Sequence, residues 1–390
     1  MTPAARLQAS ADILDRILAG EAAEKVLTTW ARKNRYAGSG DRAAIRGIVF
    51  DAYRRKRSLG WLGGEETGRG LIIGKLRDQG TEVSSIFDGQ GYGPVALSED
   101  EKTAGVALKD APAAVRLDVP DWLAETLIDD LGSEAEVILG VMRHRAPIFL
   151  RANLAKTDRV GLLDRLATEG IGAGSHALAE TAVEVEGEPR NLTRLPSFED
   201  GLFELQDAAS QAVIERLKDH LAGARVLDYC AGGGGKSLAM AALGAKEVVA
   251  HDAEPGRMHD LPARAARGAV SIEIAHDPRG MFDVVLCDAP CSGSGAWRRQ
   301  VDAKWTLTET RLKELCVIQQ DILEKAKTLV QPGGTLAYVT CSMLKVENHV
   351  QVQSFLDANP GWDAELIEQL TPLQGGDGFF ASILRAPSAT

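Results

Sequence analysis

The pattern of apolar positions changes near residue 225 of the chain. Beyond that point, short apolar runs alternate with segments of helical periodicity. The apolar runs are RVLDYC, EVVAHD, VSIEIA, DVVLCD, TLAYVTC and FFASILR. Strands that alternate with helices form a parallel, doubly wound sheet, which binds ligands at the carboxyl ends of its strands. We therefore predict an α/β domain over residues 201–390, with its chemistry at those strand ends.

Before residue 201 the spacing of apolar residues is different. Apolar residues recur at helical spacing over residues 7–18 and again over 45–52, which predicts an all-α domain within residues 1–140. Its glycine-rich part, 60–120, gives no clear pattern. Residues 141–200 combine the strand-like runs PIFLRAN and TAVEVEG with a helical segment, so we predict a small α+β insert there.

Composition and hydropathy place the chain among globular proteins. It has 390 residues, of which 45% are hydrophobic and 25% charged. Charged residues interrupt the first apolar stretch, which excludes a signal-peptide core. No apolar run approaches the roughly 18 residues of a membrane span. We expect a cytoplasmic monomer without membrane association.

Charge is distributed unevenly along the chain. The net charge of −11 disfavours contact with a polyanion. Residues 1–63, however, contain twelve Lys and Arg against six Asp and Glu. The chain therefore joins a basic module to an acidic one, and the basic module favours nucleic-acid binding.

The cysteines indicate free thiols. Five is an odd number for a disulfide framework, and no two cysteines have the CxxC spacing of zinc or redox sites. We therefore predict no metal site. The five residues are Cys230, Cys287, Cys291, Cys316 and Cys341.

A glycine-rich loop follows Asp228 at the end of the first predicted strand. Consecutive glycines let the backbone approach a ligand and present amides at the start of a helix. The P-loop pattern would need glycine at position 230, which is Cys, and the dinucleotide pattern GxGxxG fails at Ser237. The loop comprises Cys230, Ala231, Gly232, Gly233, Gly234, Gly235 and Lys236.

S-adenosylmethionine is the remaining cofactor for such a loop. Its ribose hydroxyls need an acidic acceptor at the end of the second strand, where Asp252 stands. Asp277, after the third strand, can accept from the adenine amino group. The alternative is that the glycines form a flexible turn and that the two aspartates are ordinary strand-end acids. Three strand ends that suit one cofactor favour the S-adenosylmethionine site instead.

Two cysteines follow the next two predicted strands. One strand ends in Asp288-Ala-Pro-Cys291, and the other ends in Thr-Cys341-Ser. Cytosine C5 is too poor a nucleophile to attack a sulfonium methyl group, but a thiolate that adds to C6 converts the ring to an enamine whose C5 can attack. Two cysteines can supply the nucleophile and a second group for release, with a cation such as Lys236 stabilising the thiolate.

Several segments of the chain closely resemble the Sun/RsmB-like RNA cytosine-5 methyltransferases. They are YCAGGGGKS, DAPCSGSG, KWTLTETRLKELCVIQQDIL, VTCSMLKVENHV, GDGFF, FELQDAASQAV and FLRAN. The N-terminal ARLQASADILDRIL resembles a NusB-like RNA-binding domain. The resemblance implies a Rossmann-like class I methyltransferase fold, preceded by the insert and the NusB-like domain. It also implies S-adenosylmethionine as cofactor and small-subunit ribosomal RNA as substrate.

The resemblance implies roles for the matching residues. Cys341 matches the nucleophile, Cys291 the releasing cysteine and Asp288 the acid near the base ring. The loop 230–236, with Asp252, Asp277 and Asp288, matches the cofactor contacts. The Cys230, Cys287 and Cys316 thiols are assigned to packing.

Two positions depart from the family pattern. Gly233 replaces the proline of Pro-Gly-Gly-Lys, which makes the loop more flexible and is expected to weaken cofactor binding. The helix after Asp252 lacks the asparagine often found near position 264, which leaves the contacts of Arg257 open.

The substrate base must be unpaired or flipped to reach a thiolate. We expect the RNA backbone to be contacted by the basic segment and by four further residues, Arg151, Arg298, Arg299 and Lys304. Three alternatives stay open: a transfer RNA methyltransferase, exchanged cysteine roles as in DNA cytosine methylation, and a non-catalytic RNA-binding assembly factor. Joint presence of both cysteines with the strand-end acids favours an active enzyme.

Overall fold

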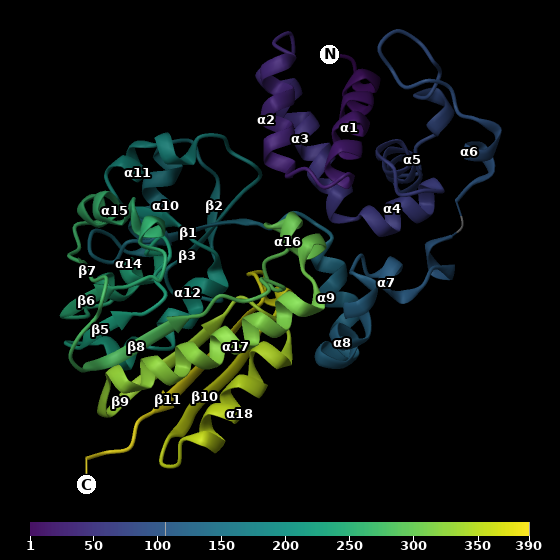
Figure 1. Ribbon diagram of the computed structural model, residues 1–390. Helices are drawn as coiled ribbons and strands as arrows, with labels where there is room; N and C mark the ends of the chain where they lie inside the picture. The colour runs from purple at the N-terminus through teal and green to yellow at the C-terminus, as the bar shows by residue number, and fades with distance from the viewer. Residues whose placement is uncertain (106, 390) are drawn as a thin grey trace. The chain divides into compact units, whose positions relative to one another are not determined.

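The computed structural model describes residues 1–105 and 107–389, which form two compact units (Figure 1). One unit combines Met1–Arg145 with Trp297–Leu307, and the other combines Ala146–Ala296 with Thr308–Thr390. The sequence predicted an uninterrupted α/β domain from residue 201, whereas an internal stretch of that region packs with the helical unit. None of the described helices is both long and apolar enough to cross a membrane.

Helices are the regular elements of the first unit among its described residues. They are α1 (Pro3–Leu18), α2 (Ala23–Lys33), α3 (Ser39–Arg54), α4 (Lys56–Gly63), α5 (Gly68–Asp78), α6 (Glu99–Thr103), α7 (Ala113–Arg116), α8 (Asp121–Leu131), α9 (Ala135–Met142) and α16 (Val301–Thr306). Apolar side chains of α1, α3 and α5 share one core cluster, which also contains Val301 of α16.

The glycine-rich region contains a buried helix. Leu71, Ile72 and Ile73 of α5 are fully buried in the core. A Cβ atom at Gly74 would lie 1.9 Å from the carbonyl oxygen of Leu59, so this glycine lets α4 and α5 pack closely. Sequence reasoning found no clear pattern here because glycines ordinarily mark turns.

A small α+β layer begins the second unit, as the sequence predicted. Its antiparallel sheet has the order β2-β3-β1-β4. The elements are β1 (Ile148–Ala152), α10 (Arg159–Thr168), β2 (Ala173–Ser175), β3 (Ala182–Val185), α11 (Pro196–Glu199) and β4 (Phe203–Leu205).

The main sheet has the order β10-β11-β9-β8-β5-β6-β7. The strands are β5 (Arg225–Asp228), β6 (Glu247–Ala250), β7 (Glu273–Ile274), β8 (Phe282–Asp288), β9 (Val330–Thr340), β10 (Asp363–Leu370) and β11 (Phe379–Arg385). Strands β5 to β9 are parallel, which confirms the predicted Rossmann-like fold. The predicted parallel sheet is wrong at β11, which runs antiparallel to both of its neighbours, β9 and β10. The connection from β10 to β11 is too short for the crossover that parallel pairing needs.

Helices cover both faces of the main sheet (Figure 1), and alternate residues of its strands pack against one helical layer or the other. Val226, Val284 and Leu286 pack with one cluster, and Leu227 and Val285 pack with the other. The first cluster includes residues of α12 (Ala208–Glu215), α13 (Lys218–Leu221) and α14 (Gly235–Ala242). The second includes residues of α17 (Glu309–Ala326) and α18 (His349–Ala358). Because helices cover both faces of the sheet, a ligand can bind only at the strand ends. The helix α15 (Leu261–Gly268) lies there, beside the glycine loop.

Candidate active site

The structure brings the two predicted cysteines together. Cys291 follows β8, Cys341 follows β9, and these two strands are paired in parallel. The sulfur atoms lie 3.5 Å apart. The backbone N–H of Gly295 donates to the carbonyl oxygen of Cys341 at 2.9 Å, so the two loops are also joined through the main chain.

The surroundings of the two thiols differ. The hydrogen bond with Cys341 and burial raise the pKa of Cys291 well above its usual value, and the charge of Glu347 adds to this. Cys291 is therefore a neutral thiol near neutral pH. Cys341 has a different neighbour, Lys236, whose ammonium group interacts electrostatically with it. A positive charge there stabilises a thiolate.

Lys236 and Asp288 form an ion pair beside the cysteines. The Lys236 Nζ atom donates to Asp288 Oδ2 at 2.6 Å. Burial disfavours the ammonium charge, but Asp288 outweighs it and raises the pKa of Lys236. About a third of the Asp288 side chain, 32%, stays exposed, so this carboxylate remains accessible to a ligand.

Asp228 lies at the start of the glycine loop and is fully buried. Its Oδ2 accepts from the Ser237 hydroxyl at 2.6 Å, whereas its Oδ1 has no partner among the described residues. Burial, aided by the charges of Asp288 and Asp252, raises the pKa of Asp228 to about 7. An unpaired acceptor of this kind is available to a ligand that carries a donor.

Asp252 is held against the same loop. Its Oδ2 accepts from the Gly232 N–H at 2.8 Å and from the Arg257 guanidinium at 3.2 Å, and its Oδ1 accepts from the Glu254 N–H. Gly232 has φ of +54°, a conformation that favours glycine. One acceptor position remains on Oδ1, because each carboxylate oxygen can accept two hydrogen bonds. The side chain of Arg257 is 56% exposed.

Asp277 stands apart from these contacts. Its side chain is 75% exposed and forms an ion pair with Arg279, two residues away. No contact of Asp277 with the glycine loop occurs among the described residues. Its predicted bond to adenine stays a prediction.

Comparison with known proteins adds to this geometry. Residues 217–385 match the family described as 16S rRNA methyltransferase RsmB/F. Over these residues the chain is similar to the RsmB/F methyltransferase family. Residues 119–191 match the ferredoxin-like domain of RsmF/B-like methyltransferases, which here spans α8, α9 and the first three strands of the small sheet.

Two curated relatives carry the name Ribosomal RNA small subunit methyltransferase B. The protein of Erwinia tasmaniensis is 34% identical over 281 residues, which cover 67% of this chain and 65% of that one. The protein of Vibrio vulnificus is 32% identical over 286 residues, with coverage of 68% and 66%. The chain thus matches slightly less than two thirds of their length.

Solved structures support the fold. A methyltransferase homologue from Pyrococcus horikoshii has a TM-score of 0.62 and 26% identity, and covers 70% of this chain and 97% of its own. The protein PH0851 has a TM-score of 0.73 at 21% identity, with coverage of 98% and 99%. The second likeness extends the shared fold to nearly the whole chain.

Arginines hold the glycine loop where the sequence departs from the RsmB/F pattern. The Arg264 guanidinium donates to the Gly233 carbonyl oxygen, and it also forms an ion pair with Glu204 of β4. Arg264 occupies the position near which the family often has asparagine. The loop at Gly233 therefore has a main-chain anchor that the sequence did not reveal.

The remaining three cysteines lie away from the thiol pair. Cys287 is fully buried within the core cluster of α17 and α18. Burial raises the pKa of both Cys230 and Cys287. Burial also raises the pKa of Cys316 to about 11. These thiols stay neutral at physiological pH, in keeping with packing roles.

Sequence reasoning missed a buried carboxylate behind the cysteines. Glu347 is fully buried and contacts Ser292, the residue after Cys291, and Ser342, the residue after Cys341. Gln319 of α17 joins the same cluster. Glu347 lies within VTCSMLKVENHV, but an isolated Glu among Lys and Asn gives no signal of burial.

Three of the four arginine and lysine residues expected to contact RNA outside the basic segment are buried. Arg151, Arg298 and Lys304 are each less than 5% exposed. Arg151 donates to Gln206 and to the Gly235 carbonyl oxygen. Lys304 donates to the Arg54 carbonyl oxygen within the helical unit. The prediction of RNA contacts is wrong for these three, because their side chains are enclosed by the protein; Arg299 is exposed.

Proposed function

We propose that the protein is a cytoplasmic, monomeric RNA methyltransferase that transfers a methyl group from S-adenosylmethionine to C5 of a cytosine in small-subunit ribosomal RNA. The observation that carries this proposal is the pair of thiols 3.5 Å apart at the ends of β8 and β9, beside the Lys236–Asp288 ion pair. The RsmB/F family match and the name shared by the curated relatives support it.

The residues around the glycine loop fit the methyl donor. Asp228 has one unpartnered buried oxygen, which suits an ammonium or hydroxyl donor. Asp252 has a remaining acceptor position for a ribose hydroxyl. A Cβ atom at Gly234 would clash with Leu261 at 2.3 Å, so the glycines keep the loop close to α15. S-adenosylmethionine supplies an electrophilic methyl group to this site.

The thiol pair supports covalent catalysis. Attack of the Cys341 thiolate forms a bond between sulfur and C6 of cytosine, and the ring electrons move to C5, which takes the methyl group. A base then removes the C5 proton, and the sulfur–C6 bond breaks with its electron pair returning to Cys341. Cys291, held as a thiol by its surroundings, assists this release. Asp288 lies near the ring edge, and Lys236 stabilises the thiolate.

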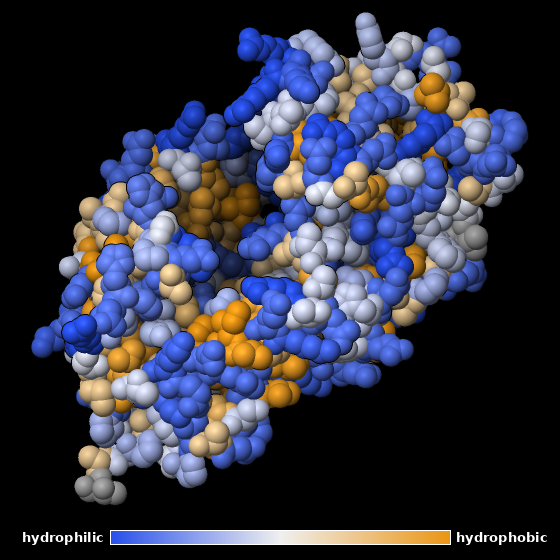
Figure 2. Space-filling model, in the orientation of Figure 1, coloured by the Kyte–Doolittle hydropathy of each residue, from blue (hydrophilic) through white to orange (hydrophobic). Residues whose placement is uncertain are grey.

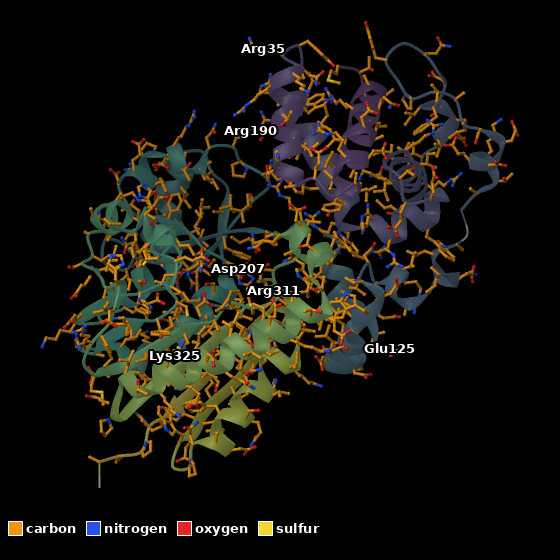
Figure 3. The ribbon with its side chains drawn as sticks, in the orientation of Figure 1. Arg35, Glu125, Arg190, Asp207, Arg311 and Lys325 are labelled. Carbon is orange, nitrogen blue, oxygen red and sulfur yellow. The ribbon has the colours of Figure 1, made fainter. Side chains whose placement is uncertain are left out.

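The end of α2 offers a surface for RNA. Arg32, Arg35 and Arg42 are exposed and form no ion pair among the described residues. Tyr36 lies among them with 73% of its surface exposed. Figure 3 shows Arg35 at the outer end of the helical unit, and Figure 2 shows that this end is hydrophilic. Cations around an exposed aromatic ring are typical of single-stranded RNA binding. We assign this surface to the NusB-like domain that the sequence predicted within residues 1–140.

The decisive experiment uses the purified chain, tritiated S-adenosylmethionine and small-subunit ribosomal RNA transcribed in vitro. We expect label in the RNA and 5-methylcytosine among its digested nucleosides. Label that appears only with transfer RNA would favour the transfer RNA alternative. Absence of label with either RNA, from protein that binds S-adenosylmethionine, would refute the proposal.

The RNA surface is tested by replacing Arg32, Arg35 and Arg42 together with alanine. Removal of one cation that neutralises a phosphate reduces the salt slope of binding by about 0.7 for single strands. We expect a weaker affinity and, for three such cations, a salt slope smaller by about 2. Replacement of the paired Arg46, which contacts Glu24, is the matched control. An unchanged slope in the triple variant would show that RNA binds elsewhere.

A further inference from the structure

One buried carboxyl group collects four hydrogen bonds behind the thiols. Glu347 Oε1 accepts from the Ser292 N–H at 2.8 Å and from Gln319 Nε2 at 3.1 Å. Glu347 Oε2 accepts from the hydroxyls of Ser292 and Ser342, each at 2.5 Å. Because both oxygens only accept, this arrangement is that of a carboxylate.

The residues around Glu347 extend this cluster to both cysteine loops. Gln319 also donates to the Pro290 carbonyl oxygen at 3.0 Å, directly before Cys291. Ser292 and Ser342 both direct their single hydroxyl proton to Glu347, so Ser294 is the donor in its 3.0 Å contact with Ser342. The residues on either side of Cys291 are therefore tied to Ser342, which follows Cys341.

We propose that Glu347 is a positioning residue that clamps the Cys291 loop to the Cys341 loop and so fixes the separation of the two sulfur atoms. Glu347 touches neither sulfur and is fully buried, so it acts through the serines. The inference rests on the proposed function, because it explains how the two reacting thiols are kept within 3.5 Å. A displacement of about 1 Å at a reacting centre can cost roughly a hundredfold in rate.

Charge gives the clamp a second effect. Glu347 is one cause of the raised pKa of Cys291, after the hydrogen bond with Cys341 and burial. The same residue thus holds Cys291 in place and adds to the rise of its pKa. A merely structural residue would do only the first, and this difference can be measured.

The test compares Glu347→Gln with the wild-type chain. Glutamine removes the charge, so the serine hydroxyls either turn to accept from its amide nitrogen or donate to a neutral amide oxygen, and both kinds of bond are weaker than bonds to a carboxylate. We expect methyl transfer to fall about 10- to 100-fold in kcat, with an unchanged KM for S-adenosylmethionine. We also expect Cys291–Cys341 disulfide formation to slow about tenfold with diamide, which takes up the two hydrogens.

The charge effect is read from alkylation of the Cys291 peptide by iodoacetamide across pH, followed by mass spectrometry. Glu347→Gln should move this profile to lower pH. Ser342→Ala removes one hydroxyl donor and keeps the charge, so it should slow disulfide formation without moving the profile. Glu314→Gln, which changes an exposed acid on α17, is the matched control and should change neither measurement.

The thiol measurements need neither RNA nor cofactor, so they remain decisive if methyl transfer is not found. Wild-type disulfide rates in both Glu347→Gln and Ser342→Ala would overturn the clamp. An unmoved alkylation profile in Glu347→Gln would overturn the role of its charge. If Glu347→Gln is poorly folded by circular dichroism, the single variants Ser292→Ala and Ser342→Ala decide the positioning claim.

Discussion

The cysteine loops and the glycine loop meet at one edge of the sheet, yet they are held in different ways. Buried neutral donors and one internal carboxylate hold the cysteine loops. Asp252, Arg151 and Arg264 hold the glycine loop. Asp252 is bonded in turn by Arg257, whose side chain is more than half exposed. The difference indicates that the cysteine loops must keep a fixed geometry, whereas the glycine loop can adjust when a ligand binds.

Removal of the attacking thiol should produce the largest effect. Cys341→Ala cannot form the bond to C6, so we expect methyl transfer to fall about a thousandfold or more. No covalent protein–RNA species should appear on denaturing gels. Cys316→Ala, which changes a thiol away from the pair, is the control.

The partner cysteine should fail at a later step. Cys291→Ala retains the attacking thiolate, so the methyl group can be transferred but the adduct should persist. We expect multiple turnover to be lost while a slowly migrating protein–RNA band accumulates. An adduct in Cys341→Ala that is absent from Cys291→Ala would show that the two roles are exchanged.

Burial of Asp228 should produce a pH dependence of stability. Its folded pKa of about 7 exceeds its ordinary value of 3.8, so the folded state binds more protons between these values. The free energy of unfolding therefore decreases as pH rises from about 4 to 7, by up to roughly 4 kcal/mol for this group. Asp228→Asn should remove that decrease. Urea unfolding at about pH 4.5, 6 and 7.5 measures the free energy of unfolding of wild type and Asp228→Asn. The same change of this free energy with pH in the two proteins would contradict the burial argument.

These carboxylates show how far sequence reasoning extends. Asp228, Asp252 and the two cysteines could be placed because strand ends in a parallel sheet share one edge. The pairing of Cys291 with Cys341 at 3.5 Å follows the adjacency of β8 and β9, which alternation alone does not specify. Glu347 could not be found, because burial of an acid depends on donors that lie far away in sequence.

The same limit applies to the fold. β10 was not predicted because DAELIEQL carries three acids and lies at the sheet edge, where polar residues are tolerated. α5 was not predicted because its glycines serve packing instead of turns. In both cases the tertiary partner, and not the local pattern, decides the structure.

The ribose acceptor should have a moderate effect on the cofactor. Asp252→Ala should weaken S-adenosylmethionine binding by about 1.5–3 kcal/mol, roughly a 10- to 150-fold increase in Kd, the range for hydrogen bonds to charged groups. Isothermal titration calorimetry measures this. Asp260→Ala, which removes an exposed acid just before α15, should leave Kd unchanged. Equal affinities of wild type and Asp252→Ala would remove Asp252 from the site.

The smallest expected effect concerns Gly233, where the RsmB/F family usually has proline. Gly233 has no positive φ, and a Cβ atom there would lie 3.4 Å from Arg264 Nη1, so a side chain fits. Its N–H makes no hydrogen bond among the described residues. Gly233→Pro should therefore restrict the unfolded chain and raise the free energy of unfolding by about 0.4–1 kcal/mol. Because the arginines leave the glycine loop adjustable, a preordered loop should also bind S-adenosylmethionine about two- to fivefold more tightly.

The control for this substitution is Gly244→Pro, in a turn remote from the loop and with φ of +96°, which proline cannot adopt. That variant should destabilise the fold, because the substitution strains the native backbone. A lower stability of Gly233→Pro as well would show that the arginines already fix the glycine loop in a conformation that excludes proline. The contrast between a rigid pair of cysteine loops and an adjustable glycine loop would then fail at Gly233.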